Sequence, residues 1–234
     1  MIEYNIMNHH SRDVSKMELK IKELKRNVII NTDYSDYYKT RNKNRYKGIN
    51  QNFFGIMKRE TKAKWKVVFH DDIAIYEKLF TNIEHILKKA PNVFIINFYN
   101  PTNKRIKEAI KNKKHVIQHY NQFWGQCTAY NVEYLKDMTT WVDENTLIGE
   151  GAEDLKVEQY CAYSNLPMYT IVPSLAQHEG YKESTFGNPA EVVGIKRNSA
   201  TYLPDFDATL VNWNAHFKTC LKDNTKVNGG LGLL

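Results

Sequence analysis

The feature that most constrains the fold is the alternation of short apolar runs with segments whose apolar residues recur at helical spacing. Val14, Met17 and Ile21, for example, lie three or four positions apart. We expect strands at 2–7, 27–31, 64–69, 92–98, 114–119 and 168–172, helices at about 14–26, 49–60, 74–89 and 131–143, a strand in "WGQCTAYN" and a further helix in "GAEDLKVEQYCAYSN". Strands that alternate with helices predict an α/β domain with a mixed, mainly parallel sheet flanked by helices.

The composition narrows the class of protein. At 234 residues, with 42% hydrophobic and 25% charged residues, the chain suits one globular domain. It has no apolar run long enough for a membrane span, and its first residues lack the basic and apolar regions of a secretory signal. Cys127, Cys161 and Cys220 are odd in number and widely spaced, so we expect free thiols and a cytoplasmic protein. The net charge of +7 permits an anionic partner.

Two adjacent carboxylates, Asp71 and Asp72, come directly after the apolar run "KWKVVF". In open α/β sheets, ligands bind beyond the carboxyl ends of the strands. Two acids at such an end are tolerated when they share a divalent cation, which can also hold phosphates. The alternative is that the pair caps the following helix and faces solvent.

A second acidic segment is "IGEGAEDLKVEQY", residues 148–160. Gly149 and Gly151 allow a tight turn, and Glu153 and Asp154 crowd the start of the predicted helix. An ionised carboxylate beside a cleft can accept a proton from a hydroxyl nucleophile. Plain helix capping is again the alternative.

The third segment is "YTIVPSLAQHEGYKESTFGNP", residues 169–189, in which His178 follows a predicted strand. A neutral imidazole can complete the coordination of a Mn²⁺-like ion beside a carboxylate. Lys182 could face a diphosphate. Both side chains could instead simply lie in solvent.

The order of these motifs, "HDD", "WGQCTAYN", "GEGAEDL" and "PSLAQHEGYKEST", resembles that of metal-dependent glycosyltransferases of the GT-A fold, especially small phage, viral and bacterial enzymes. "PSLxQHxGxxS" is also similar to a segment of some N-acetylglucosaminyltransferases, and "GEGAED" to one of the β-1,4-galactosyltransferases. The resemblance implies one Rossmann-like GT-A domain over residues 1–190. Residues 191–234 would then form a C-terminal extension for which the sequence indicates no structure.

The resemblance also implies roles for the acidic residues and the histidine. Asp72 and His178 would bind Mn²⁺ or Mg²⁺. Because the motif is HDD and not DxD, Asp71 is assigned to the ribose or to a water-mediated metal contact. Asp154 would be the catalytic base, with Glu153 as its competitor.

Donor and acceptor positions follow in the same way. Arg12 resembles the position beside the base and ribose of the donor nucleotide, and Gly48 and Asn52 resemble residues that line the donor pocket. Trp124 and Gly125 would lie on the acceptor side, where an aromatic face suits a sugar or a base.

The activity that the resemblance implies is transfer of a sugar from a nucleoside diphosphate, UDP being the commonest carrier, to a hydroxyl acceptor with inversion. The acceptor is a hydroxymethylated pyrimidine of phage or viral DNA, to which the stretches "KELKR", "KTRNKNRYK" and "KNKKH" would bind, or a glycan, lipid or protein. Two other classes stay open. They are a metal-dependent nuclease or phosphatase that uses Asp71, Asp72 and His178, and a DNA-binding module of the same fold without catalysis.

Overall fold

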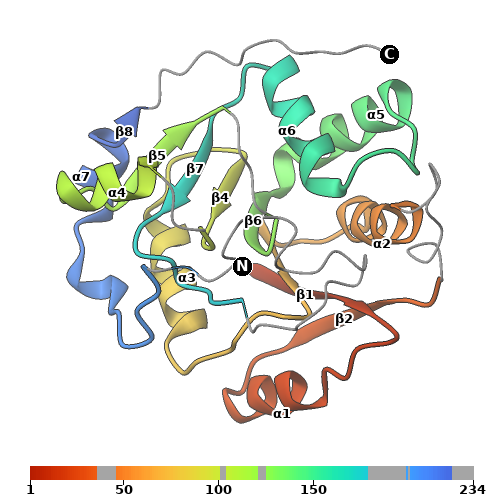
Figure 1. The fold of residues 1–234 in the computed structure, drawn as a ribbon, viewed down its shortest axis with the longest axis horizontal. Coiled ribbons are helices and arrows are strands. Elements are labelled where there is room, and N and C mark those ends of the chain that lie inside the picture. Colours follow the sequence, from red (N-terminus) through yellow and green to blue (C-terminus); the bar gives the residue numbers. More distant parts are fainter. Residues whose placement is uncertain (36–45, 101–103, 121–124, 179–198, 200, 223–234) are drawn as a thin grey trace.

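The computed structural model describes residues 1–35, 46–100, 104–120, 125–178, 199 and 201–222. A sheet of eight strands runs through the molecule in the order β2-β1-β3-β6-β4-β7-β5-β8 (Figure 1). The strands are β1 (Ile2–His9), β2 (Val28–Asp33), β3 (Trp65–His70), β4 (Ile95–Asn97), β5 (Val116–His119), β6 (Cys127–Asn131), β7 (Met168–Ile171) and β8 (Leu221–Lys222).

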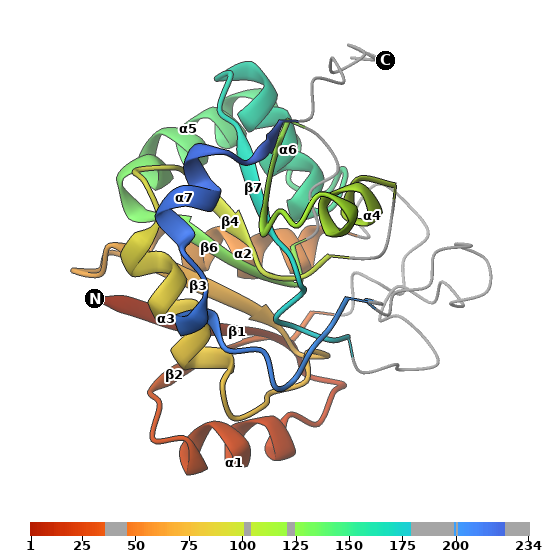
Figure 2. The same ribbon diagram turned by 90° about the vertical axis from the view of Figure 1, so that its left-hand side faces the viewer.

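Helices cover both faces of this sheet (Figure 2). They are α1 (Ser15–Glu23), α2 (Lys47–Lys58), α3 (Leu79–Lys89), α4 (Lys104–Lys111), α5 (Leu135–Asn145), α6 (Glu153–Tyr163) and α7 (Trp213–Lys218). Helices α1, α3 and α7 pack into one hydrophobic cluster on one face, and α2, α5 and α6 pack into a second cluster on the other. The central strand β3 has a core on each side, which explains its continuous run of buried residues.

Within the described residues, four of the seven strand pairings are parallel. The predicted α/β class, with a mixed and mainly parallel sheet flanked by helices, is therefore confirmed. Strand β1 pairs in parallel with both β2 and β3. The carboxyl ends of these three strands consequently meet at one edge of the sheet.

Several elements differ from the prediction. Helix α7 and strand β8 lie in residues for which the sequence indicated no structure. The helix expected from residue 74 begins only at Leu79, because Ile73 forms an antiparallel bridge with His178 and the Ala74 amide donates to the Gln177 carbonyl at 2.8 Å. Helix α4 was not predicted, since only two of its side chains, Ile106 and Ala109, are buried on an otherwise lysine-rich segment.

Residues 201–222 pack against the same core as the preceding chain. Ala208, Trp213 and Phe217 belong to the cluster that contains α3. Asn82 of α3 holds this segment by donating to the Phe206 carbonyl at 2.8 Å and accepting from the Ala208 amide at 2.9 Å. The predicted boundary at residue 190 lies outside the described residues and stays a prediction.

The structure also describes the three cysteines and the helices that could be tested as membrane spans. Cys127, Cys161 and Cys220 are free thiols. Across the parts of the chain that the structure describes, every helix is too short or too polar to cross a membrane.

A buried lysine joins β3 to α2. Lys66 has no exposed surface, and its Nζ donates to the carbonyls of Ile56 at 2.7 Å, Met57 at 3.2 Å and Arg59. These carbonyls belong to the last turn and end of α2, where the helix has no amide donors of its own to offer. Burial lowers the pKa of Lys66, and the three carbonyls compensate for its desolvation.

We expect Lys66→Met to lower the free energy of unfolding by about 2 kcal/mol, because the carbonyls at the end of α2 lose their donor while they stay buried. Urea denaturation measures this change. Lys62→Met, at an exposed lysine of the preceding turn, is the matched control and should lie close to the parent. A Lys66→Met protein as stable as the control would show that desolvation of the ammonium group cancels the three hydrogen bonds.

Candidate functional site

Polar side chains gather at the carboxyl ends of β1 and β3. Asp71 and Asp72 follow β3, and Arg12 follows β1, so the parallel pairing of the two strands brings them together. Nη1 of Arg12 donates to Oδ1 of Asp71 at 2.6 Å and to Oδ2 of Asp72 at 2.9 Å. The three side chains are at most 10% exposed. This contact overturns the capping alternative, in which the two acids face solvent.

His178 joins this group from the segment after β7. Its Nε2 lies 2.9 Å from Oδ2 of Asp72, and both side chains are buried. The antiparallel bridge between Ile73 and His178 fixes the two backbones next to each other. The structure thus brings together the two residues, Asp72 and His178, that the sequence suggested as a metal-binding pair.

The two adjacent carboxylates have opposite pKa shifts. Burial alone would raise the pKa of Asp72, but the hydrogen bond from His178 and the charges of His178, His70 and Arg12 together hold it below its usual range. The pKa of Asp71 is raised, because burial and the neighbouring charge of Asp72 outweigh Arg12 and the amide of His9. Asp72 is therefore the more strongly anionic of the pair.

The second acidic group lies at the start of α6. Glu153 is buried, and its Oε1 is 3.3 Å from Nε2 of His70, the last residue of β3. Burial, followed by the charge of Glu153, raises the pKa of Asp154 to about 7. A β-carbon added at Gly125 would lie 3.5 Å from Oε1 of Glu153 and 3.7 Å from Cβ of Asp154. The predicted base residues and the predicted acceptor residue Gly125 are thus neighbours.

Two polar side chains that the sequence analysis missed hold the turn before α6. Nδ2 of the buried Asn50 donates to the carbonyls of Ile148 at 2.6 Å and Gly151 at 2.9 Å, and Nζ of Lys156 donates to the carbonyl of Leu147 at 2.7 Å. Gly151 has φ +68°, a conformation that favours glycine. In the sequence, Asn50 could have been noticed only as a polar amide on the apolar side of the helix predicted at about 49–60.

His70 was also missed as a site residue, although it is the first letter of the "HDD" motif. Burial alone would lower its pKa, but the hydrogen bond to Glu153 and the charges of Glu153, Asp72 and Asp71 raise it. His70 therefore lies between the Asp71–Asp72 pair, which it precedes in the chain, and Glu153 at the start of α6.

The predicted donor-pocket residues lie near the ends of β1 and β2. Gly48 packs so closely against the side chains of Asp33 and Ser35 that a β-carbon would force one of them to move. Nδ2 of Asn52 donates to the carbonyls of Asn8 at 3.2 Å and Asn31 at 2.9 Å, which ties α2 to both strands. Arg12, predicted beside the nucleotide, forms ion pairs with Asp71 and Asp72, and its contact with a nucleotide stays a prediction. Lys182 and Trp124 lie outside the described residues.

The donor set of Asp72 and His178 fits a divalent cation. Two ligands of an octahedral ion at 2.0–2.1 Å are about 3 Å apart, which matches the 2.9 Å between Nε2 of His178 and Oδ2 of Asp72. Oδ1 of Asp72 is buried and has no hydrogen-bond partner among the described atoms. The described residues contain no group of three or more candidate ligands. Arg12 competes for the same carboxylate oxygen.

Comparison with known proteins gives structural likenesses only. No protein-family model matches the chain, and no curated protein sequence matches it. A197 of STIV has a TM-score of 0.42 and 10% identity, covering 77% of this chain and 87% of that chain.

Two similar structures are glycosyltransferases. One, which takes part in glycosylation of the major capsid of PBCV-1, has a TM-score of 0.38 and 10% identity, covering 69% of this chain and 74% of that chain. The other, a mutant Drosophila β-1,4-galactosyltransferase 7 in complex with manganese, UDP-Gal and xylobiose, has a TM-score of 0.42 and 13% identity, covering 77% of this chain and 72% of that chain. Likenesses at this level define neither a family nor an activity for this chain.

We expect Arg12→Met to lower the free energy of unfolding by about 3–5 kcal/mol, because it removes the guanidinium that contacts both buried carboxylates. Arg12→Lys keeps a positive charge and should lose less. Urea denaturation of both variants, with and without Mn²⁺, measures the change in the free energy of unfolding. If Asp72 and His178 bind the ion, Mn²⁺ should stabilise Arg12→Met more than the parent, since the guanidinium no longer competes. Equal stabilities of Arg12→Met and the parent would contradict the role of the ion pair.

Proposed function

We propose that the protein is a metal-dependent glycosyltransferase of the GT-A type that uses a nucleoside diphosphate sugar, with UDP as the first carrier to test. The observation that carries the proposal is the meeting of two chemically different groups at one edge of the sheet. Asp72 and His178 form a pair suited to a divalent cation, and Asp154 and Glu153 lie beyond His70 as a separate acidic pair. An enzyme that releases a diphosphate and deprotonates an acceptor needs both.

Asp72 and His178 would hold the cation together with the donor diphosphate. Such an ion stabilises, as a Lewis acid, the negative charge that develops on the leaving diphosphate. Arg12 lies against the same carboxylates and adds a fixed positive charge near the phosphates. Asp71 accepts from the His9 amide at 2.9 Å, so its carboxylate helps to keep the ends of β1 and β3 in register at this edge.

Asp154 would remove the proton of the acceptor hydroxyl as the hydroxyl attacks the anomeric carbon from the side opposite the diphosphate. A single displacement of this kind inverts the configuration. A base works best when its pKa lies near the working pH, which the pKa of about 7 at Asp154 satisfies. Glu153 raises that pKa through its charge and is itself held by His70.

The acceptor stays a prediction in two versions, a hydroxymethylated pyrimidine of DNA or a hydroxyl of a glycan, lipid or protein. A screen of these acceptors follows once the donor is known. No specific observation favours the nuclease or phosphatase alternative, because the described residues lack the larger cluster of ligands that two-metal sites use.

Donor binding is tested by thermal unfolding in the presence of a panel of nucleoside diphosphates and their sugars, with and without Mn²⁺. A ligand at 100 times its dissociation constant should add about 2.7 kcal/mol to the stability. We expect one nucleotide to stabilise the parent only with Mn²⁺, and Asp72→Asn to abolish the shift. Asp137→Asn, at an exposed acid of α5, is the control and should keep it. No shift with any nucleotide would refute the proposed donor site.

The role of Asp154 is tested by the pH dependence of turnover once the donor is known. Because the base must be ionised, kcat/KM should rise with pH and level off above about pH 7. Asp154→Asn should lower kcat about 10²–10⁴-fold and remove this dependence. Glu144→Gln, at an exposed acid of α5, is the matched control and should keep the parent's rate and profile. If Asp154→Asn keeps the parent's kcat and pH dependence, Asp154 is not the catalytic base and Glu153 becomes the candidate.

A further inference from the structure

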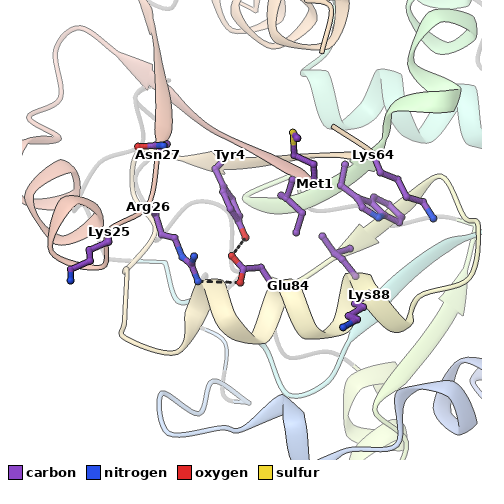
Figure 3. Close-up of a pocket in the computed structure, with 11 residues that line it drawn as sticks. Met1, Tyr4, Lys25, Arg26, Asn27, Lys64, Glu84 and Lys88 are labelled. Carbon is purple, nitrogen blue, oxygen red and sulfur yellow. Dashed lines mark hydrogen bonds and ion pairs between the residues drawn. The ribbon is translucent and has the colours of Figure 1, made fainter. Parts of the chain in front are cut away.

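A separate pocket of about 640 Å³ opens at the amino ends of β1, β2 and β3 (Figure 3). Its volume lies within the range of small-molecule sites, roughly 300–1,000 Å³. The lining residues come from β1, from the turn before β2, from the start of β3 and from α3; they are Met1, Ile2, Tyr4, Lys25, Arg26, Asn27, Lys64, Trp65, Glu84, Leu87 and Lys88.

This pocket lies at the opposite end of the same parallel strands from the candidate active site. Lys64 precedes β3, whereas Asp71 and Asp72 follow it. A strand of this length spans roughly 20 Å. The pocket therefore shares no residue with the Asp72–His178 pair, and the inference below does not depend on the proposed function.

The charges in the pocket are unbalanced. Glu84 is the one acid among its lining residues, and it is already engaged by Nη2 of Arg26 at 3.1 Å and by the hydroxyl of Tyr4 at 3.2 Å. Lys25, Lys64 and Lys88 are exposed and form no ion pair with any residue that the structure describes. Figure 3 places Lys25 and Arg26 at one end of the pocket and Lys64 and Lys88 at the other.

We propose that this pocket binds a phosphate-bearing ligand. The ammonium groups at its two ends suit separate phosphates, for which lysine is a common point-charge partner. Arg26, the one guanidinium in the lining, already contacts Glu84 through Nη2, so its charge is partly compensated within the pocket. Ile2, Trp65 and Leu87 add apolar side chains to the lining. The phosphates belong either to a small molecule or to a single-stranded nucleic acid, and the test separates these sources.

The test measures binding of inorganic pyrophosphate by calorimetry in EDTA, which removes any metal from the Asp72–His178 pair. We expect the parent and Asp72→Asn to bind equally. Lys64→Glu/Lys88→Glu should bind roughly tenfold more weakly, since two attractive charges become repulsive. Lys107→Glu/Lys111→Glu, which makes the same charge change on the exposed side of α4, should bind like the parent. Lys64→Gln/Lys88→Gln replaces the first variant if that variant unfolds.

A short single-stranded oligonucleotide is then added to the pyrophosphate complex. If it displaces pyrophosphate, the ligand is a single-stranded nucleic acid. If it does not, the ligand is a small molecule. Three results would overturn the proposal. They are no binding of pyrophosphate to the parent, equal affinities of the pocket variant and the α4 control, or loss of binding in Asp72→Asn, which would move the site to the other end of the strands.

Discussion

The ion pair between Arg12 and the adjacent carboxylates Asp71 and Asp72 is the interaction on which the carboxyl edge of the sheet depends. Two nearly buried acids in sequence would repel each other and lose their hydration. One nitrogen of Arg12 contacts both, so the end of β1 is held against the residues after β3. Asp72 in turn fixes His178, and through it the segment after β7. One compensated charge cluster therefore joins three distant parts of the chain.

The same electrostatics separates two kinds of carboxyl group within one site. Asp72 has cationic partners on several sides, and its pKa is low. Asp154 has burial and another acid beside it, and its pKa rises to about 7. An anion that stays charged suits cation binding, whereas a carboxylate that titrates near neutrality suits proton transfer. The neighbours of each group, more than its chemical type, determine what it can do.

The sequence predicts the elements better than it predicts their contacts. Apolar periodicity located β3 and α6, and strand-end logic located Asp72, because both depend on local pattern. The role of Asn50 was not predicted, because its hydrogen-bond partners, Ile148 and Gly151, are 98 and 101 positions away in the chain. The late start of α3 was also not predicted, because it depends on a distant contact. Ile73, before the helix, forms a bridge with His178. Helix propensity says nothing about such partners.

The position of β6 in the sheet has a consequence for how the chain assembles. Ala129 of β6 pairs with Val67 of β3 on one side and with Ile96 of β4 on the other, so these two strands never touch directly. During synthesis, β3 and β4 emerge before the strand that connects them, and each presents an open apolar edge until β6 follows. The nascent protein would thus hold β2, β1 and β3 as a separate half. Asp72 and His178 would meet only after β6 has joined the two halves and the segment after β7 has followed.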